Sequence, residues 1–187
     1  MSKTGFQITE LHPDNTPLYL LDGCASLYCE IWQEPPWNES FWTMSEVLKN
    51  MYLELRKKQA KGFLALTANS SLHLEPIGLT WGYGVNREEM RLISGTTQLD
   101  HFFKKDRRVF YIDELGVKAN MRIKNVGTEL SRKLIKWAMG RGFATILLRT
   151  DIRAISARIL YSKLGFNELD IFDAKECQRN YWALKIH

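Results

Sequence analysis

A loop rich in basic and amide side chains joins a strand to a helix in this chain of 187 residues. The loop and the helix start comprise Arg122, Ile123, Lys124, Asn125, Val126, Gly127 and Thr128. Helix N-termini carry unpaired N–H groups and a partial positive charge, so they bind phosphate well. A glycine there lets a ligand approach the backbone closely. The segment therefore predicts a site for a phosphate-bearing molecule.

Neither of the two common phosphate-loop patterns describes this segment. It contains no GxxxxGK[ST] sequence and no GxGxxG fingerprint of dinucleotide-binding proteins. Many strand–loop–helix turns carry glycine and lysine without binding a ligand, so the loop alone is a weak signal. A second motif is needed to give it meaning.

A second block of motif residues lies in a later helix, and it follows the pattern Ala-x-x-x-Tyr-x-Lys-x-Gly-Phe. The matching positions are Ala157, Tyr161, Lys163, Gly165 and Phe166. Together with the loop, this block resembles the GNAT superfamily of acetyl-coenzyme A-dependent N-acetyltransferases, in particular its single-domain members of bacterial type.

The resemblance extends from about residue 107 to residue 186. The family's pyrophosphate loop reads Arg/Gln-x-x-Gly-x-Gly/Ala, and this chain has Arg122-x-x-Asn125-x-Gly127. The strand before that loop commonly reads Ile-x-x-Leu-x-Val, and the matching residues are Ile112, Leu115 and Val117. The resemblance implies acetyl-coenzyme A as co-substrate, bound by Leu115, Val117, the loop residues 122–128, Ser156 and Lys163.

Two positions depart from the family pattern. Asn125 replaces the first loop glycine, and asparagine is one of the few other residues that tolerates a left-handed backbone. Ala154 stands where an asparagine is often found, seven residues before the helix tyrosine. Whether Ser156 compensates for that lost polar contact stays open.

The resemblance also assigns roles in the reaction. Tyr161 is the expected general acid for the departing thiolate, since a tyrosine pKa near ~10 is close to that of a thiol. A backbone N–H near Val117 is expected to polarise the thioester carbonyl. Strict alternation along the strand places Asp113 on the face of Val117 and makes it the first candidate for the base. Glu114 is the runner-up if a bulge breaks the alternation, and either acid could instead only attract a cationic amine.

Candidates for the acceptor site are less specific. Trp37 and Glu39 belong to a loop that lines the acceptor site in the family, and Trp81 and Tyr83 lie on the strand before the cofactor strand. The aromatic residues could form an acceptor wall or belong to the core, and core is the more common role.

The elements that must position these residues alternate in type. We predict strands at 6–11, 63–67, 77–83, 109–117, 144–149, 166–172 and 181–186. We predict helices at 17–32, with Thr16 as N-cap, and at 40–60, 127–140 and 154–164. Residues 69–71 are expected to form a hairpin turn, and residues 85–106 receive no assignment. The fold class is α/β (α+β), a GNAT-like, largely antiparallel mixed sheet flanked by helices.

Composition favours one globular domain over residues 1–187. Hydrophobic residues make up 45% of the chain and charged residues 25%, and the net charge of +5 is spread along the chain. No signal peptide, membrane-spanning run or zinc-ligand spacing is visible, and the three cysteines suggest reduced buried thiols. We therefore expect a cytoplasmic protein without a metal and without a nucleic-acid or membrane partner.

The sequence thus predicts an enzyme that moves an acetyl group from acetyl-coenzyme A to a primary amine by direct attack in a ternary complex. The acceptor stays open between a small molecule and a lysine or N-terminus of a peptide or protein. The alternative is a module that senses acyl-coenzyme A without turnover, and a basic nucleic-acid-binding domain ranks last. The oligomeric state is also open, with a homodimer as one option.

Overall fold

The structure, a computed structural model, describes residues 5–68, 73–104 and 107–186, except the side chain of Ile123. Its elements in chain order are β1 (Gln7–Leu11), α1 (Leu18–Trp32), α2 (Met44–Glu54), β2 (Lys61–Ala68), β3 (Leu74–Val85), α3 (Arg87–Ser94), η1 (Asp100–Phe102), β4 (Val109–Val117), η2 (Ala119–Lys124), α4 (Val126–Gly140), β5 (Thr145–Asp151), α5 (Ile155–Lys163), β6 (Asn167–Phe172) and β7 (Arg179–Lys185). No helix in these ranges has the length and apolar content that crossing a membrane requires.

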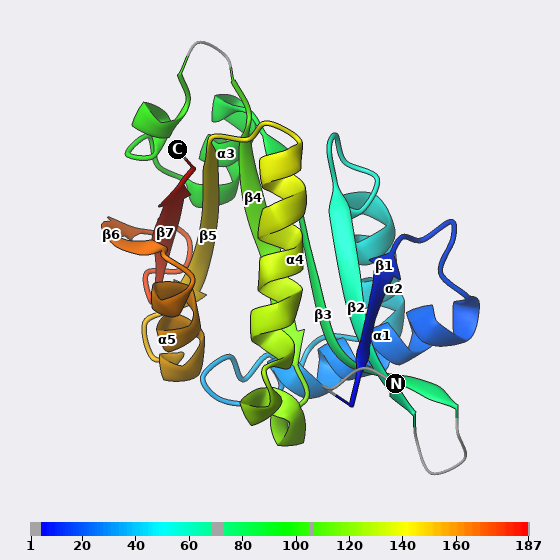
Figure 1. The fold of residues 1–187 in the computed structure, drawn as a ribbon. Helices are drawn as coiled ribbons and strands as arrows, with labels where there is room; N and C mark the ends of the chain where they lie inside the picture. The colour runs from blue at the N-terminus through cyan, green and yellow to red at the C-terminus, as the bar shows by residue number, and fades with distance from the viewer. Residues whose placement is uncertain (1–4, 69–72, 105–106, 187) are drawn as a thin grey trace.

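Seven strands form one sheet in the order β1-β2-β3-β4-β5-β7-β6 (Figure 1). Neighbouring strands are antiparallel except β4 and β5, which run parallel. The predicted fold, a mixed and largely antiparallel sheet flanked by helices, is confirmed. The β2–β3 hairpin is present as well, although its predicted turn at residues 69–71 lies outside the described residues.

The two parallel strands separate part-way along their length. Their paired positions run from Phe110–Ile146 to Ile112–Leu148. Beyond these pairs β4 continues to Val117 and β5 to Asp151, with no further β4–β5 pairing in the described chain. An opening therefore lies in the sheet at the carboxyl ends of these strands.

Helices cover the two faces of the sheet separately. In Figure 1, α4 and α5 lie in front of the sheet, and α1 and α2 lie behind it. The predicted inner face of α4 is confirmed, because Leu130, Leu134 and Ala138 are fully buried and Trp137 packs against the same cluster. Burying one leucine side chain contributes roughly 1.5–3 kcal/mol, so this face holds α4 firmly on the strands.

The helix α3 is an element that the sequence prediction missed. It begins with a capping box, in which the Asn86 side chain accepts from the Glu89 N–H and the Glu89 carboxylate accepts from the Asn86 N–H, both at 2.8 Å. It ends at Gly95, which adopts a left-handed backbone with φ of 68°. Both end signals are typical of helices.

The predicted boundaries of two helices were wrong. The second helix begins at Met44 instead of residue 40, because Thr43 forms a capping box with Glu46, and it ends at Glu54 well before residue 60. At the first helix, Pro17 occupies the N-cap position. The Thr16 hydroxyl accepts a hydrogen bond from the His12 N–H instead of capping the helix.

Candidate active site

The predicted phosphate loop forms a tight connection between β4 and α4. A short 3₁₀ turn, η2, leads to Asn125, whose φ of 62° is the left-handed conformation expected for this position. The helix then begins at Val126, and the buried Gly127 lies beside Val117 and Leu160, where a Cβ would be 3.4 Å from each side chain. The start of α4 therefore lies between β4 and α5, where its free N–H groups can receive an anion.

Arg122 is the loop residue with the most defined contacts. Its Nε donates to the Val117 carbonyl over 3.0 Å, and its guanidinium forms an ion pair with Glu34 in the connection between α1 and α2. Lys124 and Asn125 are exposed and Thr128 is half-buried, whereas the side chain of Ile123 lies outside the described part. A phosphate at the helix start would find Lys124 accessible and Arg122 already bound to a carboxylate.

Tyr161 lies near the end of α5 with its ring in the core under α4. It packs against Phe166 and Trp182, with ring centroids 5.9 and 6.2 Å away. Burial, reinforced by the nearby Glu114 carboxylate, raises the pKa of its hydroxyl. Tyr161 therefore keeps its proton at neutral pH and has one to donate.

The other predicted residues of α5 lie at its two ends. Ser156 is in the first turn and Lys163 is the last residue, and both are exposed. Ala154 is at the N-cap position, and no side chain caps the helix. The Ile155 N–H at the helix start donates to the Arg153 carbonyl over 2.9 Å, so only the N–H groups after it in the first turn stay available to a ligand.

The prediction that Asp113 shares the face of Leu115 and Val117 was wrong. Trp81 pairs with Glu114, but the next β3 residue, Gly82, pairs with Ile112, so a bulge leaves Asp113 as the extra residue. Leu115 and Val117 face α4, while both acids face the opposite side of the sheet. The bulge named as the alternative is present, and it directs Asp113 and Glu114 to the same side.

Neutral donors hold the carboxylates on that side. The Tyr83 hydroxyl donates to Asp113 Oδ2 and the Tyr28 hydroxyl donates to Glu114 Oε1, each over 3.0 Å. Burial and the other carboxylates raise the pKa of Glu114 well above its usual range. The raised pKa makes the Glu114 carboxylate a stronger base than a free glutamate.

Asp113 and Glu114 line a cavity of about 250 Å³ that reaches from α2 across β4 to β5 and β7. Its lining residues are Tyr28, Trp32, Glu39, Phe41, Trp42, Val47, Asn50, Glu54, Trp81, Asp113, Glu114, Arg149, Glu176 and Arg179. Because it includes Arg149, just past the last β4–β5 pair, the cavity lies at the opening in the sheet.

Two of the four predicted acceptor residues line this cavity. Glu39 and Trp81 do, whereas Tyr83 lies behind Asp113 as its hydrogen-bond donor. Trp37 is one layer further out and stacks on Trp32, with ring centroids 6.5 Å apart. These two residues support the cavity wall without forming it.

Sequence reasoning missed most of the cavity wall. The aromatic residues Tyr28 and Trp42 and the acidic Glu54 come from α1, α2 and their connection, and Arg149 and Arg179 come from β5 and β7. None belongs to a local motif. The folded topology brings them together, so only the strand order could have indicated them.

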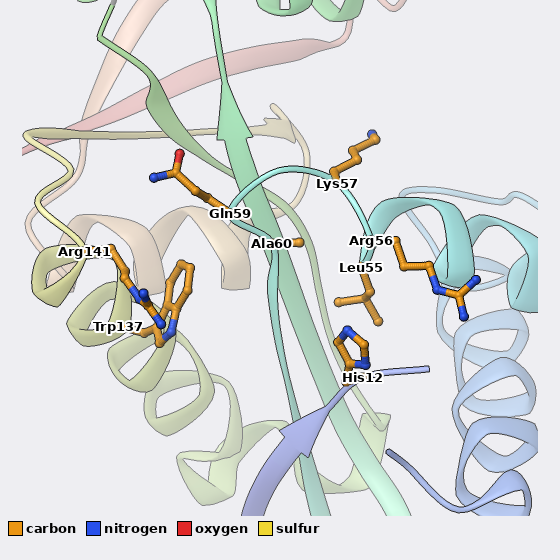
Figure 2. A pocket seen from close by; sticks show the side chains of 8 residues that line it. All are labelled: His12, Leu55, Arg56, Lys57, Gln59, Ala60, Trp137 and Arg141. Carbon is orange, nitrogen blue, oxygen red and sulfur yellow. The ribbon is translucent and has the colours of Figure 1, made fainter. Parts of the chain in front are cut away.

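A second cavity, of about 430 Å³, lies far from the loop (Figure 2). It is lined by His12, Leu55, Arg56, Lys57, Gln59, Ala60, Trp137 and Arg141. Trp137 and the adjacent Arg141 belong to the carboxyl end of α4, roughly 20 Å along the helix from its start at Val126. Its cationic lining would also repel a protonated amine, so we do not assign the chemistry to it.

The comparisons with known proteins agree with this arrangement. The sequence matches the acetyltransferase (GNAT) family over residues 24–166. No curated protein sequence matches the chain. Similar folds are the GNAT acetyltransferase from Staphylococcus aureus Mu50 (16% identity, TM-score 0.65, covering 97% of this chain and 99% of that chain) and PaiA N-acetyltransferase from Thermoplasma acidophilum, solved with coenzyme A (14%, 0.65, 100% of both).

The Arabidopsis thaliana NAA60 structure with acetyl-CoA is a third such fold, with 13% identity and a TM-score of 0.68 over 97% of this chain and 98% of that one. The family match covers most of the chain, so the protein belongs to the GNAT acetyltransferase family. It is an N-acetyltransferase family enzyme, and acetyl-coenzyme A is its co-substrate. The family typically acts on an amine acceptor.

Proposed function

We propose that the protein transfers acetyl from acetyl-coenzyme A to a primary amine by direct attack within a ternary complex. The observation that carries this proposal is the opening between β4 and β5. On one face it adjoins the start of α4 and Tyr161, and on the other it adjoins the cavity with Asp113 and Glu114. A thioester and an amine arriving from opposite faces would meet there.

The cofactor side binds and orients the thioester. The N-terminus of α4 with residues 122–128 receives the pyrophosphate, and Ser156 and Lys163 are candidates for further contacts. The freed edge of β4 near Val117 offers a backbone N–H to the thioester carbonyl. These roles agree with the positive end of the α4 dipole and with the unpaired strand edge.

The chemical step then needs two proton transfers. The amine nitrogen forms a bond to the acyl carbon, the carbon–sulfur bond breaks, and Tyr161 gives its proton to the leaving thiolate. Asp113 or Glu114 accepts a proton from the amine, directly or through water. The products are the N-acetylated amine and coenzyme A. Tyr161 is protonated at neutral pH and so has a proton to give, and the raised pKa of Glu114 makes its carboxylate a stronger base for the amine proton.

Two measurements test the proposal. Calorimetry should show binding of acetyl-coenzyme A, and thiol release should rise when amines of several classes are added. Absence of coenzyme A binding at millimolar ligand would refute the acetyl transfer. Binding without thiol release from any amine class would favour a sensor instead.

Cellular location and domain organisation belong to the proposal as well. A cytoplasmic location agrees with the three free cysteines, although only Cys24 is buried, Cys29 is half-buried and Cys177 is exposed, so the prediction of buried thiols holds for one of them. The domain prediction of a single unit over residues 1–187 fits the continuous sheet, to which strands from both ends of the described chain contribute.

A further inference from the structure

One wall of the acceptor cavity carries an excess of negative charge. Glu54, Asp113 and Glu114, here called the acidic wall, all line it, and no described lysine or arginine forms an ion pair with any of them. The cavity's two arginines are already paired, Arg149 with Asp173 and Arg179 with Glu39. Lys57 and Arg179 therefore act on Glu54 and Glu114 only from beyond ion-pair distance, and the acidic wall is incompletely neutralised in the described chain.

The donors that orient the acidic wall are all uncharged. The Trp81 indole N–H donates to Glu54 Oε2 over 2.7 Å, and two tyrosine hydroxyls donate to Asp113 and Glu114. No described residue donates to Glu114 Oε2, an oxygen of a side chain that lines the cavity. The carboxylates of the acidic wall can therefore still accept hydrogen bonds, and a bound ligand would have to donate those bonds and carry a positive charge.

The pKa values of the acidic wall agree with its lack of ion pairs. Burial, and then the charge of Asp113, raises the pKa of Glu54 to about 8, and Glu54 lies within hydrogen-bonding range of Asp113. Burial and both neighbouring acids raise the pKa of Glu114. Glu54 and Glu114 therefore bind protons more readily than free glutamates do, as expected for carboxylates that lack a bound cation.

The shape and donor set favour an organic cation. Tyr28, Trp42 and Trp81 present aromatic surfaces to the cavity, and such surfaces attract ammonium groups. Its volume of about 250 Å³ corresponds to about eight waters at ~30 Å³ each, enough for a short aliphatic chain. Among the described residues, no three His, Cys, Asp or Glu side chains are arranged to hold a metal ion.

We propose that the acceptor is a short aliphatic diamine or polyamine, with one nitrogen at the β4–β5 opening and a second, still protonated, nitrogen at Glu54. This inference rests on the proposed acetyl transfer and narrows its acceptor. Glu54 bonds Trp81 on β3, which lies on the side of β4 away from β5. A second nitrogen bound there is separated from the reacting one and remains an ammonium group in the product.

The test uses three acceptors with the same four-carbon chain: 1,4-diaminobutane, butylamine and 4-aminobutanoate, together with a blocked lysine amide. Initial rates of thiol release from acetyl-coenzyme A give kcat/KM for each. We expect the diamine to exceed butylamine by about tenfold or more, the size of one charge-assisted hydrogen bond. The carboxylate compound should be the poorest acceptor.

A variant then locates the second nitrogen. Glu54→Gln keeps an acceptor for the Trp81 N–H and removes the charge, so the preference for diamine over butylamine should fall towards one. Glu30→Gln changes an exposed glutamate on α1 and should keep the preference. An unchanged preference in Glu54→Gln would contradict the assignment of Glu54.

The outcomes separate this inference from the proposed function. Equal kcat/KM for diamine and butylamine, or a better rate with the lysine amide, would overturn the diamine proposal while acetyl transfer stands. If no amine is acetylated, acetyl transfer fails, and calorimetric titration of the coenzyme A complex with 1,4-diaminobutane and butylamine still decides the inference. A diamine Kd no lower than the monoamine Kd would overturn it.

Discussion

The two sides of the β4–β5 opening differ in what they are made of. The cofactor side consists mainly of backbone: the free N–H groups of α4, a left-handed Asn125 and an unpaired strand edge, all within residues 113–128. The acceptor side consists of side chains that come from α1, α2, β3, β4, β5, β7 and the connections between them. Apart from its α5 residues such as Tyr161, the cofactor side is therefore local in sequence, and the acceptor side is not.

The difference also appears in the electrostatics. The positive end of a helix dipole on the cofactor side is fixed by the fold and needs no titratable group. On the acceptor side, three carboxyl groups crowd one cavity, and the pKa values of Glu54 and Glu114 rise. A constant anion site thus faces a cation site whose charge depends on pH and on its occupant.

The largest expected effect is on proton donation from the cofactor side. Tyr161→Phe keeps the ring contacts with Phe166 and Trp182 and removes only the hydroxyl. Turnover should fall by ~10²–10⁴-fold, the usual contribution of general acid catalysis, with little change in acetyl-coenzyme A affinity. Steady-state kinetics with calorimetry on the same preparation measures both, and wild-type turnover would remove Tyr161 as the acid.

The next effect distinguishes the two acids on the bulge. If Asp113 is the base, Asp113→Asn should lower kcat at neutral pH by ~10²-fold and recover partly at high pH, where more of the amine is already neutral. If Asp113 only attracts the amine, KM should rise while kcat is kept. Glu114→Gln is the matched variant, and pH–rate profiles of both show which carboxyl group titrates with activity.

The cofactor side could be predicted from sequence because its signals are contiguous. Arg122, Asn125 and Gly127 lie within one loop, and the left-handed backbone of Asn125 followed from its residue type. The seven strands were also recognisable from apolar runs. The helix α3 was missed because it buries only Met90 and Ser94, although its capping box and Gly95 were visible in the sequence.

The acceptor side could not be predicted in the same way. The alternation of side chains along β4 breaks at Asp113 because of a bulge, and that bulge depends on the partner strand β3. On β3, a Cβ added to Gly82 would lie 2.4 Å from the Tyr111 carbonyl oxygen. Glu54 and Arg179 are close to the same cavity only because the sheet order brings α2 and β7 near β4. No spacing in the sequence encodes that proximity.

A smaller effect concerns the pH dependence of the free energy of unfolding, which tests the electrostatic difference between the two sides. The pKa of Glu54 is raised from 4.5 to about 8, so folding favours its protonated form. This stabilisation is fully present below pH ~4.5 and is lost as the pH rises through ~8. Glu54→Gln should therefore lose less unfolding free energy than wild type between pH 5 and pH 9, by up to about 1.4 kcal/mol for each pH unit between ~5 and ~8.

Urea unfolding at the two pH values measures this difference. Glu30→Gln is the control, because this exposed α1 glutamate should leave the pH dependence of stability as it is in wild type. An identical pH dependence in wild type and Glu54→Gln would mean that the acidic wall is not electrostatically strained.

The smallest expected effect concerns the loop backbone on the cofactor side. Asn125 has a φ of 62°, which glycine adopts without a steric cost and which alanine adopts at a cost of roughly 1–2 kcal/mol. Asn125→Gly should therefore change acetyl-coenzyme A affinity and stability by less than about 1 kcal/mol, since relief of strain is offset by a more flexible unfolded chain. Asn125→Ala should lose more stability than Asn125→Gly, although it removes fewer atoms. Thermal unfolding and calorimetry of the pair decide the matter, and an alanine variant as stable as the glycine variant would show that the loop does not depend on the left-handed residue.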